Sequence, residues 1–113
     1  MAETNDRLGA VVLLVLVPGG VSLEEPVAAL LDLDIAATSV DTRGLSDLIK
    51  HEIPIFGGVA RRLPDSPSGR LLLSITTRER AEAALAELAT LSAGTKPVLA
   101  VIVPAERVVG LGE

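Results

Sequence analysis

A short turn containing glycine and lysine is the first place where this sequence suggests chemistry. Gly94 and Lys96 are separated by one residue, so the lysine charge and the accessible backbone of the turn could together hold a phosphate group. Gly44 can likewise let the backbone approach a ligand, and Thr38 and Thr42 carry hydroxyls that can donate to a base or a phosphate. All five residues also fit ordinary roles in turns and strands, so both interpretations stay open.

A stretch rich in proline and glycine contains residues suited to contacting a partner. Phe56 is the only aromatic residue of the chain, and it either fills the protein's own core or anchors a partner protein. Arg61 and Arg62 are adjacent positive charges in an acidic chain. They suit an acidic partner, a ligand on a neighbouring copy, or simple solvation. His51, the only histidine, is expected to be solvated or to cap a helix.

Several classes of function are disfavoured by what the 113 residues lack. There is no cysteine, which excludes disulfides, thiolate metal sites and a cysteine nucleophile. No local spacing pairs two carboxylates for acid–base chemistry, so we expect a protein that is not an enzyme and has no catalytic or metal-binding residue. The chain has 10 basic and 15 acidic residues, and its net charge of −5 disfavours binding to nucleic acid.

The pattern of apolar residues predicts four strands and two main helices. The predicted strands are residues 10–17, 35–42, 70–75 and 98–103, and the predicted helices are residues 22–32 and 77–91. Residues 45–52 fit two further helical turns. Ser22 and Glu25 form a capping-box pattern at the first helix, and Thr76 or Thr77 is expected to cap the second. The first helix has an expected core-facing stripe of Leu23, Val27, Leu30 and Leu31.

The predicted order β-α-β, long loop, β-α-β indicates an α+β fold of the ferredoxin-like, split βαβ type. It has an antiparallel four-stranded sheet with two helices on one face, and a long loop over residues 43–69 between strands 2 and 3. We expect residues 1–113 to form this one domain, with an N-terminal tail at residues 1–8. Strands 1, 3 and 4 are apolar at adjacent positions, so both faces of the sheet need cover, and two helices can cover only one. We therefore predict that copies of the chain associate.

The beginning of the chain carries no pattern typical of export. Residues 1–7 contain two acids and one base, and the apolar run at residues 10–17 is eight residues long. A membrane-spanning helix needs about 20 apolar residues. We therefore expect a cytoplasmic protein.

The element order and several short motifs resemble those of the P-II signalling family and its P-II-like relatives, over about residues 9–113. The motifs that carry the resemblance are Val40-Asp-Thr-Arg-Gly44, Gly94-Thr-Lys96 and Pro104-Ala-Glu-Arg-Val-Val-Gly110. The resemblance implies a homotrimer that binds a small effector, an adenine nucleotide such as ADP, AMP or ATP, in clefts between subunits. Residues 43–69 would then be the T-loop, which signals to a partner protein, a membrane transporter being one candidate.

The same resemblance assigns roles to the residues introduced above. Thr38, Thr42, Gly44, Gly94 and Lys96 would contact the ligand, and Phe56, Arg61 and Arg62 would contact the partner. The sequence departs from the P-II pattern at Gly110 and Gly112, where that family has two arginines that grip phosphate. Their loss removes charge-assisted hydrogen bonds worth about 1.5–3 kcal/mol each.

Two alternatives follow from these observations. One is a structural or interaction trimer whose nucleotide site has decayed. The other is a protein of the CutA family, which the stretch Leu71-Leu-Leu-Ser-Ile-Thr-Thr-Arg-Glu-Arg80 resembles.

Overall fold

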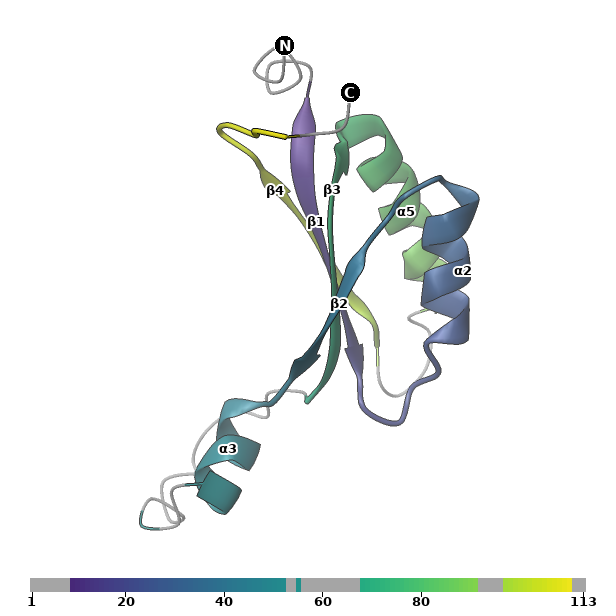
Figure 1. Cartoon of the computed structure of the whole chain (residues 1–113). Coiled ribbons are helices and arrows are strands. Elements are labelled where there is room, and N and C mark those ends of the chain that lie inside the picture. Colours follow the sequence, from purple (N-terminus) through teal and green to yellow (C-terminus); the bar gives the residue numbers. More distant parts are fainter. Residues whose placement is uncertain (1–8, 53–54, 56–67, 92–96, 111–113) are drawn as a thin grey trace.

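The computed structural model has an α+β fold in which an antiparallel sheet carries helices on one side (Figure 1). It describes residues 9–52, 55, 68–91 and 97–110. The sheet order is β2-β3-β1-β4, and neighbouring strands are antiparallel. This order confirms the predicted ferredoxin-like fold. Within the described ranges the strands are β1 (Ala10–Pro18), β2 (Thr38–Thr42), β3 (Gly69–Thr77) and β4 (Leu99–Pro104), and the helices are α2 (Glu24–Asp32), α3 (Leu45–Glu52) and α5 (Arg78–Leu91).

The core lies between the sheet and the two helices α2 and α5. Side chains alternate across a strand, so every second residue of β1 faces the helices. Val11, Leu13, Val15 and Val17 occupy these positions and are almost completely buried. Ala81 and Ala84 of α5 are fully buried too, and their small side chains let the helix approach the sheet closely.

The helix α2 buries a narrower stripe than the sequence predicts. Leu30 is buried as expected, together with Pro26 and Ala29, but Leu31 is 64% exposed. The prediction for Leu31 was wrong because the helix turns its Pro26–Ala29–Leu30 side to the core. The chain therefore has a large apolar side chain in solvent on the outer surface of α2. No helix in the described ranges combines the length and apolar character needed to cross a membrane.

A hydroxyl caps the start of α5 as predicted, whereas α2 lacks the predicted side-chain cap. The Thr77 hydroxyl accepts a hydrogen bond from the Arg80 amide at 3.2 Å, which satisfies an amide that the first turn of α5 leaves free. At α2 the Ser22 hydroxyl accepts from the Glu24 amide at 3.1 Å. The helix begins at Glu24 and its N-cap residue is Leu23, which makes no side-chain cap bond, so the capping box predicted for Ser22 and Glu25 is not formed.

The strand β2 begins three residues later than the apolar pattern predicts, because α2 ends in a tight cap. The Ile35 amide donates to the Leu30 carbonyl at 2.9 Å, and the Asp34 amide donates to the Leu31 carbonyl at 3.0 Å. These two bonds form a Schellman motif with Asp34 in the left-handed region, at φ 59°. The Ile35 amide is thus used by the helix, and its side chain is buried in the core.

The sheet surface that faces away from α2 and α5 is apolar, with exposed side chains on β2, β3 and β4 and half-buried ones on β1. Figure 1 shows α2 and α5 on one side of the strands, and within the described ranges no helix or strand packs on the other side. We call this surface the open face and define it by ten residues: Val12, Leu14, Leu16, Val40, Leu71, Leu73, Ile75, Leu99, Val101 and Val103. The structure thereby confirms that both faces of the sheet are apolar.

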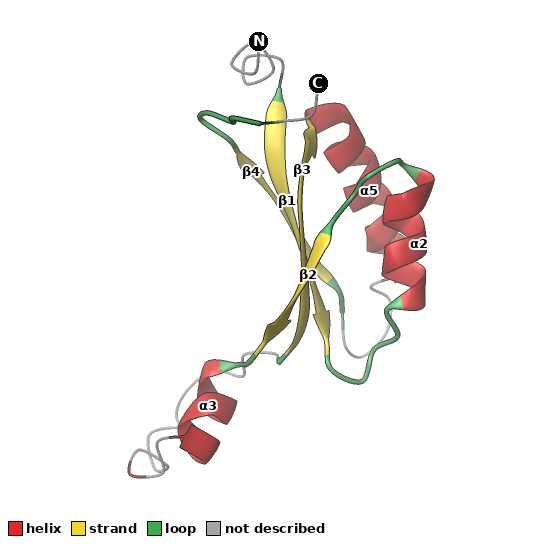
Figure 2. Ribbon diagram, viewed as in Figure 1, coloured by secondary structure: helices red, strands yellow, loops and turns green. Residues whose placement is uncertain are grey.

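The helix α3 lies beyond the end of the sheet and apart from the other two helices (Figure 2). It follows β2 directly, so it is the first element of the predicted loop over residues 43–69. The two helical turns predicted at residues 45–52 are confirmed.

Candidate functional site

The candidate site lies where the chain leaves β2 and returns to β3. Thr42, the last residue of β2, is the register partner of Gly69, the first residue of β3. The Gly69 amide donates a hydrogen bond to the Thr42 hydroxyl at 3.0 Å. This bond closes the end of the sheet beyond which α3 lies, and we call residues 43–68, which join Thr42 to Gly69 along the chain, the projecting segment. The hydroxyl that the sequence offers to a ligand is therefore used within the chain.

Ser68 joins both ends of the projecting segment. Its hydroxyl accepts a hydrogen bond from the Gly44 amide at 2.8 Å and makes a long contact of 3.4 Å to a carboxylate oxygen of Asp47. Its carbonyl accepts from the Gly19 amide, in the turn after β1, at 2.7 Å. One residue thus connects β2, α3 and the end of β1. We call Thr42, Gly44, Asp47, Ser68 and Gly69 the latch.

The backbone of β1 and its turn passes so close to position 69 that only glycine fits there. A Cβ at this position would lie 2.1 Å from the Val17 carbonyl oxygen and 2.9 Å from the Gly19 amide nitrogen. Both neighbours are backbone atoms, which cannot rotate aside as a side chain can. The absence of a side chain at Gly69 therefore lets β3 start beside the turn that ends β1, which places Ser68 within reach of Gly19.

Hydrogen bonds and ion pairs within residues 43–52 connect α3 to the latch. The Gly44 carbonyl accepts the first helical bond, from the Leu48 amide at 2.9 Å, so Gly44 starts the helix while its amide binds Ser68. Asp47 lies in the first turn, where the helix dipole favours a negative charge. Its second carboxylate oxygen lies 3.0 Å from His51 Nδ1. An ion pair of 2.5 Å between Arg43 and Glu52 spans the length of the helix.

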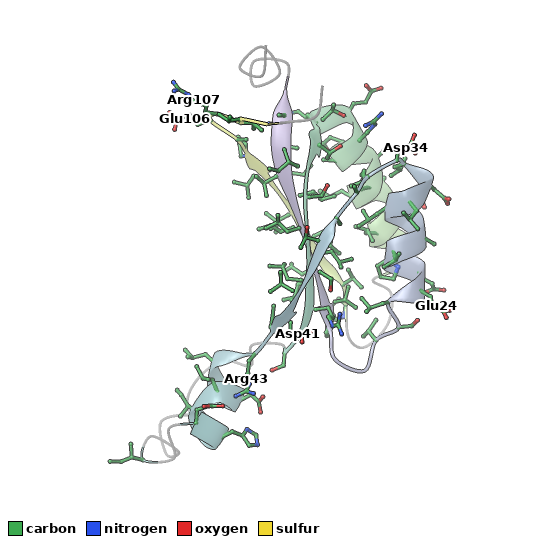
Figure 3. All side chains as sticks on the ribbon, in the orientation of Figure 1. Glu24, Asp34, Asp41, Arg43, Glu106 and Arg107 are labelled. Atoms are coloured by element: carbon green, nitrogen blue, oxygen red, sulfur yellow. The ribbon has the colours of Figure 1, made fainter. Side chains whose placement is uncertain are left out.

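A groove beside the latch is lined mainly by backbone and aliphatic groups, with one positive charge. Its volume is about 260 Å³, and its lining comes from residues 17–21, Leu23, Gly69 and Arg70. The Arg70 guanidinium contacts the Asp41 carboxylate at 2.7 Å and donates to the Ser39 hydroxyl at 3.1 Å. Figure 3 shows Asp41 near the end of β2, close to Arg43 at the start of the projecting segment. The groove has room for a small molecule, and the guanidinium of Arg70 beside it is paired with Asp41.

The structure brings together two of the sequence-predicted ligand residues. Thr42 and Gly44 both belong to the latch. Thr38 lies at the other end of β2, exposed and opposite Leu73, so it is apart from them. The remaining predicted residues, for ligand and for partner, lie outside the described ranges: Gly94, Lys96, Phe56, Arg61 and Arg62.

Sequence reasoning missed the residues that complete the site. Ser68 and Gly69 stand in a Pro-Ser-Gly stretch that indicates a turn and nothing more specific. Arg70 is the first residue of the strand predicted at residues 70–75, and its position in the sequence assigns it no role at a site. A polar residue followed by glycine at the start of a strand is the one feature that could have indicated them. Such a pair can make the turn by which a long loop re-enters a sheet.

The described residues contain no cluster of three or more histidine, cysteine, aspartate or glutamate side chains that could hold a metal ion. Polar groups of the site instead contact one another or backbone amides. These contacts fix the start of α3 against the first residues of β3. In the comparisons with known proteins, no family model, curated protein or solved structure matches this chain.

Proposed function

We propose that this chain is a P-II-like regulatory protein of the cytoplasm, which assembles as a homotrimer and senses a small effector. The effector class that we favour is an adenine nucleotide, bound in a cleft between subunits. Binding would be signalled to a partner protein, with a membrane transporter as one candidate, through residues 43–69. The ferredoxin-like sheet with a long excursion between β2 and β3 supports this proposal.

The observation that carries the proposal is the position of Ser68 between the groove and the projecting segment. We place the groove on one wall of the proposed cleft, so a ligand there would contact Gly69, Arg70 or the turn at Gly19, and the Gly19 amide donates to the Ser68 carbonyl. The Ser68 hydroxyl in turn holds the Gly44 amide. A shift of Ser68 by a few tenths of an ångström would weaken that bond, so ligand binding and the start of α3 are coupled.

The chemistry of the groove also agrees with a ligand that carries few negative charges. Arg70 supplies one guanidinium, which already shares its charge with Asp41. Lys96 would supply another positive charge, on the basis of the family resemblance. ADP or AMP needs fewer positive partners than ATP, so these two are the favoured effectors.

Isothermal titration with ATP, ADP and AMP tests the proposal directly. We expect at least one of them to bind with a dissociation constant below millimolar, and Arg70→Ala to weaken it. The Arg78→Ala variant is a matched control, because Arg78 is an exposed arginine that pairs with Glu82 on α5, in a different part of the fold. Absence of binding by all three nucleotides would contradict the sensing role.

One observation favours the alternative of an interaction protein with a decayed nucleotide site. Gly110 stands where the P-II pattern has an arginine, so this position carries no charge. Its φ of +84° is a conformation that favours glycine. Under this alternative the protein captures its partner equally well with and without nucleotide. A partner-capture assay at saturating ADP therefore separates the two functions.

A further inference from the structure

Arg70 is the charged side chain of the groove, and its side-chain contacts are with β2. Its Nε lies 2.7 Å from a carboxylate oxygen of Asp41, and its Nη1 donates to the Ser39 hydroxyl at 3.1 Å. Among the described ion pairs, Asp41 is the carboxylate that Arg70 contacts. A guanidinium has five N–H donors, so these contacts leave donors for a further anion.

The groove and these three residues lie on the same side of the sheet. Side chains alternate along a strand, so Arg70 shares a side with Leu72, which is buried under the helices. Asp41 is the register partner of Arg70 and belongs to that side too. Ser39 precedes Asp41 by two residues and shares its side. The groove is lined by Arg70 and by Leu23 at the start of α2, so an anion that binds Arg70 there comes close to the Asp41 carboxylate.

The contact between Asp41 and Arg70 can be exchanged for another. The Asp41 side chain is 82% exposed and that of Arg70 is 50% exposed, so water can solvate both charges when they separate. An anion that takes Nε displaces Asp41. An anion that takes the other donors is repelled by Asp41, because both are then bound to one guanidinium. In either case the carboxylate lowers the affinity of the groove for anions, and this effect increases with the charge of the anion.

We propose that Asp41 is a specificity-determining residue, whose carboxylate competes with anionic ligands for the Arg70 guanidinium. The inference rests on the proposed function, because it takes the groove as part of the effector site. It deepens that function by naming the group that selects among effectors. Each unit of negative charge beside Arg70 costs a ligand about twofold to fivefold in affinity. Asp41 therefore favours AMP over ADP and ADP over ATP.

Isothermal titration of the full chain with AMP, ADP and ATP tests this competition. Asp41→Asn keeps the shape of the side chain and removes its charge. We expect this variant to bind AMP at least about twofold and ATP at least about fivefold more tightly than the wild type does. Asp32→Asn is the matched control, since it makes the same change in net charge at an exposed aspartate at the other end of α2 from Leu23. Equal gains in the two variants, or no gain in Asp41→Asn, would overturn the inference.

A substitution of opposite sign gives a second test at the same guanidinium. Ser39→Asp places another carboxylate beside Arg70 Nη1, on an exposed strand. We expect it to weaken the binding of ATP more than that of AMP, because the repulsion grows with the charge of the ligand. A Ser39→Asp variant that binds ATP as tightly as the wild type would contradict the competition.

A probe that is not a nucleotide separates this inference from the sensing role. Inorganic pyrophosphate carries negative charge without a base, and the nitrogen resonance of Arg70 Nε reports its arrival at the guanidinium. We expect half-saturation at an at least about threefold lower pyrophosphate concentration in Asp41→Asn than in the wild type. Arg78 Nε is the internal reference, because its side chain is 52% exposed, pairs with Glu82 on α5 and should respond equally in both proteins. Equal responses of Arg70 in the two proteins, or no response in either, would refute the inference.

The two proposals fail separately. If pyrophosphate reaches Arg70 more readily in Asp41→Asn but no adenine nucleotide binds, the sensing role is lost and Asp41 keeps its role toward other anions. If nucleotides bind equally well to the wild type and to Asp41→Asn, the sensing role stands and this inference falls.

Discussion

The Ser68 hydroxyl accepts a hydrogen bond from the Gly44 amide at 2.8 Å, across 24 residues of sequence. This bond joins the residue that starts α3 to the residue that precedes β3. This bond lies where the projecting segment leaves the sheet. The last register pair of β2 and β3, Thr42 and Gly69, is directly beside it.

Replacing Ser68 with alanine should loosen α3 without unfolding the sheet. The variant leaves the Gly44 amide without its acceptor, which costs about 1 kcal/mol for a partly buried group. Hydrogen exchange should show faster exchange of the Gly44 amide and unchanged protection in β1. Ser39→Ala serves as the control, since the described hydrogen bond of the Ser39 hydroxyl is with the exposed side chain of Arg70. Equal exchange at Gly44 in wild type and Ser68→Ala would contradict the latch.

Gly69→Ala should destabilise the protein by about 2–3 kcal/mol. Its Cβ would lie 2.1 Å from the Val17 carbonyl oxygen, so the start of β3 must move away from β1, at a cost typical of overpacking. The free energy of unfolding in urea measures this. Gly19→Ala is a graded comparison, because its Cβ would lie 3.3 Å from the Ser68 carbonyl and needs only a small shift. Similar losses in the two variants would argue against a steric role for Gly69.

Asp34→Gly should stabilise the protein by roughly 0.5–1 kcal/mol. Asp34 caps α2 with a φ of 59°, a conformation that costs a residue with a side chain more than it costs glycine. Thermal unfolding would show a higher midpoint. Asp34→Ala removes the same carboxylate but keeps the strained backbone, so it should not stabilise. A rise of the midpoint in both variants would attribute the effect to charge instead.

Ser74→Ala should cost about 1–2 kcal/mol, although a serine in an apolar strand looks dispensable. The Ser74 side chain is buried, with 4% exposure, and its hydroxyl donates to the Ala36 carbonyl at 2.6 Å. Its removal leaves that carbonyl without this donor in the segment before β2. Urea unfolding measures the loss, and Ser39→Ala on the neighbouring exposed strand should change stability by less than about 0.5 kcal/mol.

The fold could be predicted from sequence because its determinants are local. The run Ala10–Val17 is apolar on both sides, and the alanine and leucine spacing of α5 repeats with the helical period. The late start of β2 could not be predicted in the same way. Ile35 has the side chain of a strand residue, but its amide completes the cap of α2, a choice that depends on the backbone of Asp34.

The candidate site was only half predictable for a related reason. Thr42 and Gly44 stand out as a hydroxyl and a glycine at the end of a strand. Their partners Ser68 and Gly69 follow 24 and 27 residues later, and only the pairing of β2 with β3 brings them close. Contacts of this kind depend on strand register, which a single sequence does not state.

Thr42 lies two residues beyond Val40 on the same side of β2, so the open face ends beside the latch. In an assembly built through that surface, each latch borders a neighbouring subunit. If the proposed trimer forms in this way, the effector response of one subunit would depend on its neighbours, and a Hill coefficient different from one would report that coupling.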